Sequence, residues 1–184
     1  LLSFSIIMII VNLFHKYKYF SQNQTNDLGH LNINMIDEQL DTLIGQKINF
    51  SNLELVHNRN TNIELNKKLY LVGFFSIHTC GNCIFKELAE WEKIKKLNNN
   101  IQVVAVSIDK NESDIFRFIS HFKPKISVYK TIENNYTFAK KATTVLLLDS
   151  KKNVINTYFS EVGNDSKRSE FYNTINLFIQ QNIK

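Results

Sequence analysis

The sequence contains only two cysteines and a single proline among its 184 residues. Two cysteines are too few for a small protein stapled by several disulfides, and too few for a structural zinc site with four cysteine ligands. One proline and five glycines exclude collagen-like and proline-rich linker sequences. At about 150 residues per domain, the length fits one domain with a short extension.

A strong excess of charge of one sign is also lacking. The chain has 22 Lys and Arg against 17 Asp and Glu, a formal net charge of +5, and the lysines are spread along its length. This distribution favours a solvated surface over a tract that binds nucleic acid, so no nucleic-acid partner is expected. The hydrophobic fraction of 43% is ordinary for a globular protein and too high for a disordered one.

Residues 1–14, LLSFSIIMIIVNLF, carry no charge and only three polar side chains. A run of this length is short for a membrane span and is typical of the core of a signal sequence. No small-x-small cleavage pattern follows Phe14, which favours an uncleaved signal anchor over a cleaved signal peptide. The remaining alternative is a buried N-terminal helix or strand. We therefore expect an anchor or signal segment at 1–14, a linker at 15–41 and a folded domain at 42–184.

Within that domain, apolar runs of strand length alternate with segments of helical spacing. Strands are predicted at 48–56, 69–77, 101–109, 126–130, 143–149 and 154–160. Helices are predicted in a short stretch ending at Gly45, from Cys83 to about Asn98, at 112–122 and at 166–181, with a helix or turn at 134–142. This order predicts an α/β fold with a mixed central sheet flanked by helices, in which the last two strands form a hairpin.

Helical spacing also predicts which side chains enter the core. The expected buried positions are Ile84, Leu88, Trp91, Ile94, Ile115, Phe118, Ile119, Phe122, Phe171, Ile175 and Phe178. Phe116 is expected in the core or in the wall of a packed groove.

Both cysteines lie in one motif, Cys80-Gly81-Asn82-Cys83, between a buried strand and a helix. Backbone N–H groups and the helix dipole at a helix N-terminus stabilise a thiolate, the form of cysteine that acts as a nucleophile. Two intervening residues place the second sulfur about one turn into the helix, where it can attack a mixed disulfide on the first. The alternatives are an inert disulfide, two buried thiols, or a metal site completed by His78 and His121.

The run LYLVGFFSIHTCGNCIFKELAEWEKI resembles the strand–CxxC–helix core of the thioredoxin superfamily. Three further segments are similar to the TlpA/ResA-like membrane-anchored thiol-disulfide oxidoreductases: IGQKINFSNLEL, VVAVSID with the following helix and ISVYK, and TTVLLLDSKKNVINTYF. Together the similarity spans about residues 42–182.

The resemblance implies a thioredoxin-like fold and a thiol-disulfide oxidoreductase that reduces disulfides of exported proteins. Cys80 would attack the substrate disulfide, Cys83 would resolve the mixed disulfide, and a membrane electron donor would reduce the pair again. It further implies a periplasmic location, with the domain tethered to the inner membrane by the N-terminal segment. No cofactor and no metal are expected.

Three prolines and one tryptophan of that family are replaced here. Thr79 stands where tryptophan usually precedes the first cysteine, Asn82 where proline precedes the second, and Leu88 where proline lies in the following helix. Ala142 replaces the cis-proline of the loop that pairs with the substrate, so Ala142 and Thr143 are the expected substrate loop. A cis bond is not expected at Ala142, because a non-proline cis peptide costs about 2.5–4 kcal/mol.

Two side chains are candidates for tuning the thiolate. His78, two residues before Cys80, could stabilise it as the imidazolium or relay a proton, or be an exposed loop residue without a role. Glu87, one helical turn past Cys83, could accept its proton, or belong to a solvated helix face. The family's glutamate lies one residue earlier, at Lys86, and its buried acid on the preceding strand is replaced by Phe74.

Two other classes of function stay open at this point. One is a thioredoxin-fold copper metallochaperone that uses the cysteine pair with His78 or His121, although such proteins typically have three residues between the cysteines. The other is a redox-inert interaction module.

Overall fold

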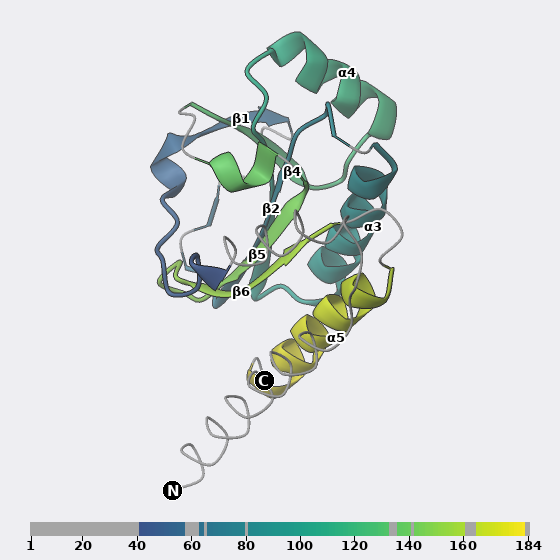
Figure 1. Ribbon diagram of the computed structural model, residues 1–184. Helices are drawn as coiled ribbons and strands as arrows, with labels where there is room; N and C mark the ends of the chain where they lie inside the picture. Colours follow the sequence, from purple (N-terminus) through teal and green to yellow (C-terminus); the bar gives the residue numbers. More distant parts are fainter. Residues whose placement is uncertain are drawn as a thin grey trace, which may run out of the picture. The chain divides into compact units, whose positions relative to one another are not determined.

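The computed structural model describes residues 41–57, 63–64, 66–79, 81–132, 136–140, 142–160 and 165–182. All of them belong to one compact unit, Glu38–Lys184 (Figure 1). The predicted anchor at 1–14 and almost all of the predicted linker at 15–41 lie outside the described residues. Within the described part, no helix has the length and apolar character needed to cross a membrane.

A mixed six-stranded sheet forms the centre of the unit, in the order β1-β4-β3-β2-β5-β6. Its strands are β1 Leu53–His57, β2 Leu69–Phe75, β3 Ile101–Ser107, β4 Ser127–Thr131, β5 Thr144–Leu148 and β6 Val154–Phe159. Strands β2, β3 and β4 are parallel, whereas β1, β5 and β6 join the sheet by antiparallel pairing. This confirms the predicted mixed sheet and the β5–β6 hairpin.

Three helices and two short 3₁₀ helices complete the described fold (Figure 1). Their bounds are α3 Gly81–Leu97, α4 Glu112–Phe122, α5 Asp165–Asn182, η1 Phe50–Asn52 and η2 Thr137–Lys140. Helix α4 matches its predicted range because its ends are capped. Asn111 accepts a hydrogen bond from the Ser113 N–H at 3.1 Å, and Lys123 takes a left-handed conformation with φ of 47°.

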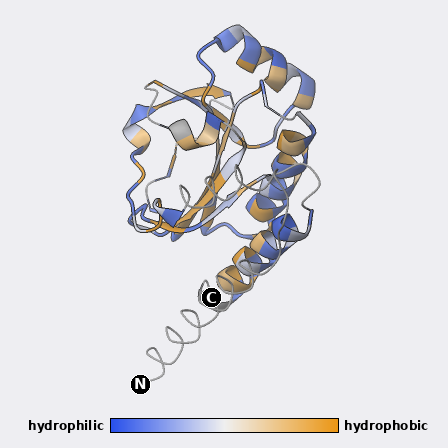
Figure 2. Cartoon of the chain, viewed as in Figure 1, coloured by the Kyte–Doolittle hydropathy of each residue, from blue (hydrophilic) through white to orange (hydrophobic). Residues whose placement is uncertain are grey.

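The two faces of β2 belong to different layers of the core, because side chains alternate across a strand. Leu69, Leu71 and Phe75 lie in the cluster that contains the buried faces of α3, α4 and α5. Tyr70, Val72 and Phe74 lie in a second cluster, with η1 and the residues around η2. Hydrophilic and hydrophobic residues alternate along α3 and α5 in Figure 2, as expected of helices with one buried face.

Two expectations about local structure are wrong. Residues 48–52 do not continue β1, because the Asn49 side chain accepts a hydrogen bond from the Ser51 N–H and turns the chain into η1. Ile48 and Phe50 are buried, but they belong to this turn and not to a strand.

The second wrong expectation concerns Phe116, which is 50% exposed because it lies on the outer side of α4, away from Phe118. The segment 134–142, for which a helix or turn is predicted, contains the 3₁₀ helix η2.

Candidate dithiol site

The junction between β2 and α3 holds the CxxC motif. Strand β2 ends at Phe75 and α3 begins at Gly81. Cys83 lies in the first turn of α3, is 8% exposed and is disulfide-bonded. Cys80, the chain's other cysteine, lies outside the described residues. The structure therefore places Cys83 at the start of a helix at the end of a central buried strand.

The segment Ser76–Thr79 leads from β2 toward the motif and is held by its own hydrogen bonds. The Ser76 carbonyl accepts from the Thr79 hydroxyl at 2.6 Å and from the Thr79 N–H at 3.1 Å. The Ser76 hydroxyl oxygen also accepts from the His78 N–H at 3.2 Å. Residues 76–79, which precede Cys80, therefore form a hydrogen-bonded turn.

Asp109 anchors this turn to the sheet and was missed by the sequence analysis. It follows β3 and is 9% exposed. Its carboxylate accepts from the Ser76 hydroxyl at 2.7 Å, the Ile77 N–H at 2.8 Å and the Ser107 hydroxyl at 2.9 Å. A signal was available, because the carboxyl ends of neighbouring parallel strands meet at one edge of a sheet. A polar residue that closely follows β3, the parallel neighbour of β2, is therefore expected to lie near the end of β2.

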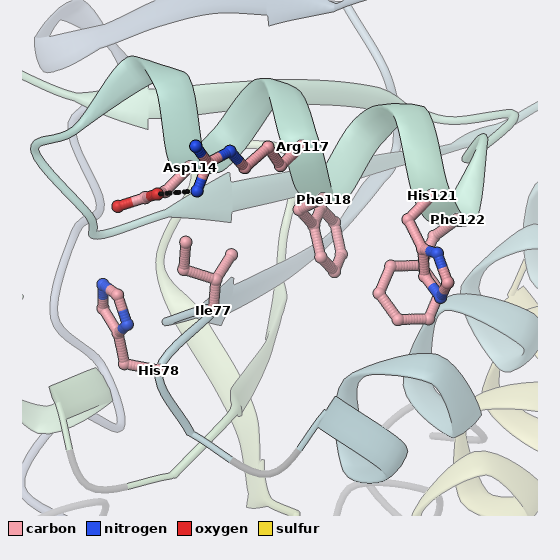
Figure 3. Close-up of a pocket in the computed structure, with 7 residues that line it drawn as sticks. All are labelled: Ile77, His78, Asp114, Arg117, Phe118, His121 and Phe122. Carbon is pink, nitrogen blue, oxygen red and sulfur yellow. Dashed lines mark ion pairs between the residues drawn. The ribbon is translucent and has the colours of Figure 1, made fainter.

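His78 is largely exposed, with its Nε2 4.0 Å from Asp109 Oδ1. It lies at one end of an open pocket of about 280 Å³, and His121 of α4 lies at the other end (Figure 3). Separated in this way, the two histidines do not form a joint ligand set. Across the described residues, no group of three or more His, Cys, Asp or Glu side chains is placed to hold a metal ion.

The pocket lies between the Ile77–His78 segment and α4. Its apolar lining comes from Ile77, Phe118 and Phe122, and an ion pair of Asp114 with Arg117, 3.8 Å apart, lies on its rim (Figure 3). The apolar surface continues onto α3, where the ring of Phe85 lies 5.9 Å from that of Phe122 and is 56% exposed. An apolar surface therefore borders the first turns of α3.

Glu87 is fully buried, so the expectation of a solvated helix face is wrong for this residue. Its carboxylate accepts from the Ser160 hydroxyl at 3.0 Å and from the Tyr172 hydroxyl, and Arg168 Nε lies 3.7 Å away. Burial raises the pKa of Glu87 above its ordinary value of 4.5, while the Tyr172 and Ser160 hydrogen bonds and the Arg168 charge oppose the rise. The buried carboxyl lies one helical turn beyond Cys83.

The raised pKa of Glu87 predicts a pH dependence of stability. Above about pH 4.5, the folded state holds a proton that the unfolded state releases, so the free energy of unfolding falls as pH rises through this window. Glu87→Gln cannot ionise and should lose this dependence. The stability of Glu87→Gln relative to wild type should rise from pH 4 to pH 7, by at most about 1.4 kcal/mol per pH unit.

Urea unfolding at several pH values measures this difference. Glu170→Gln, on an exposed position of α5, is the matched control and should follow the wild-type curve. If the free energies of unfolding of Glu87→Gln and wild type changed equally with pH, the prediction would be contradicted.

Ala142 and Thr143 lie at the same edge of the sheet as the β2–α3 junction. Thr144, which begins β5, pairs with Phe74 near the end of β2. Thr143 is 2% exposed and its carbonyl accepts from the Ser160 N–H at 2.8 Å. No peptide bond between described residues is cis. The bond before Ala142 involves Lys141, which is not described.

No protein-family model and no curated protein matches the sequence. Solved structures do resemble its fold. A thioredoxin-like protein from Porphyromonas gingivalis aligns with a TM-score of 0.54 at 14% identity, over 77% of this chain and 96% of that one. The thioredoxin domain of a thiol-disulfide oxidoreductase from Bacteroides vulgatus aligns with a TM-score of 0.50 at 16% identity, over 62% and 81%. These similarities show that the chain has a thioredoxin-like fold.

Proposed function

We propose that this protein is a thiol-disulfide oxidoreductase whose redox-active group is the pair Cys80 and Cys83. The observation that carries the proposal is the disulfide-bonded Cys83 in the first turn of α3, at the end of the buried strand β2. A cysteine in this position of a thioredoxin-like fold is close to unpaired backbone N–H groups that stabilise thiolates. The Bacteroides vulgatus protein, whose name includes thiol-disulfide oxidoreductase, supports the same class.

The proposed reaction moves two electrons from the dithiol to a substrate disulfide. The Cys80 thiolate attacks one substrate sulfur, forms a mixed disulfide and releases the other substrate sulfur as a thiolate. Cys83 then loses its proton and attacks the Cys80 sulfur. The second substrate thiolate leaves, and the Cys80–Cys83 disulfide remains.

We further propose that the substrates are exported proteins and that the enzyme is of the TlpA/ResA-like type. The apolar segment 1–14 would tether it to the inner membrane, with the domain in the periplasm, and a membrane electron donor would reduce the pair after each cycle. An oxidised pair needs such a donor there, because the compartment lacks the cytosolic thiol-reducing systems.

Reduction of insulin disulfides with dithiothreitol as the electron source tests the proposal. The wild-type protein should accelerate insulin precipitation well above the uncatalysed rate, and Cys80→Ala should return it to background. Ser169→Ala, on an exposed position of α5, should behave as wild type. Equal background rates for wild type and Cys80→Ala would contradict the proposal. Stoichiometric Cu(I) binding lost on His78→Ala or His121→Ala would instead indicate a metallochaperone.

A further inference from the structure

Asp109 is a buried carboxyl that the proposed reaction does not use. Within the described residues, its one ion-pair partner is His78, at 4.0 Å, and no lysine or arginine forms an ion pair with it. Burying a carboxylate is costly unless donors replace the lost water, and here three donors do so. Two of the three come from the segment between β2 and the CxxC motif.

The contacts of Asp109 link that segment to β3. One oxygen binds the Ser76 hydroxyl, while the other binds the Ile77 N–H and the Ser107 hydroxyl. The backbone supports the same junction, because the Ile108 N–H donates to the Phe75 carbonyl at 2.9 Å. Ser76 in turn accepts hydrogen bonds from the His78 N–H and the Thr79 hydroxyl. The Asp109 carboxylate therefore holds the Ser76–Thr79 turn in place.

We propose that Asp109 is a positioning residue of the dithiol site: it holds the Ser76–Thr79 turn, from which the chain continues through Cys80 into α3. The inference rests on the proposed function. Small displacements of a reacting group are costly, and a shift of about 1 Å can slow a reaction about a hundredfold. Asp109 acts through the turn and does not itself touch the substrate.

Two variants disrupt the hydrogen bond between Ser76 and Asp109, and only one of them changes the charge. Asp109→Asn removes the negative charge and one acceptor, whereas Ser76→Ala removes the donor and leaves the charge in place. Both should lower insulin reduction per folded molecule by about tenfold or more, since a displacement of about 1 Å can cost about a hundredfold and a smaller one costs less. Glu112→Gln is the control, because it removes an exposed carboxylate at the start of α4 and should retain wild-type activity.

A second measurement does not depend on a protein substrate. In a Cys83→Ser background at pH 7, iodoacetamide should alkylate Cys80 several-fold more slowly in both variants than in the parent. Amide hydrogen exchange of Ile77 should accelerate in Asp109→Asn, while the amides of β2 stay protected. A purely structural role would lower thermal stability and leave the alkylation rate of the folded protein unchanged.

The outcomes separate the two proposals. Slower alkylation in both variants supports positioning even if the wild type fails to reduce insulin, in which case only the proposed function is overturned. If alkylation of Cys80 slowed in Asp109→Asn but not in Ser76→Ala, the cause would be the loss of charge, and the positioning role would be overturned. Wild-type alkylation rates in both variants would also overturn it.

Discussion

A Cys83→Ser variant should lose multiple-turnover disulfide reduction, by about a hundredfold or more, and should accumulate as a mixed disulfide with its substrates. Serine is close to cysteine in shape, so the first turn of α3 should fold normally around this 8% exposed side chain. The variant keeps Cys80 as nucleophile but lacks the thiol that releases the substrate. Turnover assays with insulin, and non-reducing gels with mass spectrometry of trapped proteins, measure the two effects.

The double variant Cys80→Ser with Cys83→Ser is the control, and it should trap nothing. Persistent turnover in Cys83→Ser would show that another thiol resolves the intermediate and would contradict the assigned role. Exported proteins among the trapped species are expected from the proposed location.

Replacing Gly73 by alanine should destabilise the domain by about 3 kcal/mol, the upper end of the usual cost of overpacking. A Cβ at this position of β2 would lie 2.1 Å from the Cη2 and Cζ2 atoms of Trp91. The indole cannot easily retreat, because Trp91 is fully buried and its Nε1–H donates to the Tyr172 hydroxyl at 2.8 Å. Urea unfolding should show a lower transition midpoint.

Gly81→Ala is the matched control, since no atom beyond its chain neighbours and the backbone of its own helix lies within 4 Å of the added carbon. Its free energy of unfolding should stay within about 0.5 kcal/mol of wild type. Combined with Trp91→Leu, which removes the clashing ring, Gly73→Ala should cost less than it does alone, giving a favourable coupling in a double-mutant cycle. Wild-type stability of Gly73→Ala would contradict the prediction.

Hydropathy patterns predicted the central part of the fold because they report local periodicity. The continuous apolar run of β2 and the capped, amphipathic α4 carry their signals within a few residues. The segment 48–52 was misassigned because its apolar residues alternate as in a strand, while the Asn49 side chain decides the backbone. The alternation of apolar and polar residues alone does not reveal a hydrogen bond from a side chain to the backbone.

The missed features of the site depend on contacts between distant parts of the chain. Glu87 resembles a surface residue in a helix of lysines and glutamates, and its burial depends on the distant partners Ser160, Arg168 and Tyr172. Asp109 was recoverable in principle from the pairing of parallel strands, but its donors Ser76 and Ile77 precede it by more than thirty residues. The position of Cys83 near the start of a helix after a buried strand was predictable from the sequence, whereas the partners of Glu87 were not.

The partners of Glu87 also constrain the order in which the domain can form during synthesis. Chains emerge from the ribosome from the N-terminus, so α3 is available well before residues 160–172. Until those residues arrive, an ordered α3 cannot bury Glu87 among its native partners, and the carboxyl must stay in water. We therefore expect α3 to dock fully only after residues 160–172 have emerged, so the candidate dithiol site is completed after the described strands of the sheet have been synthesised.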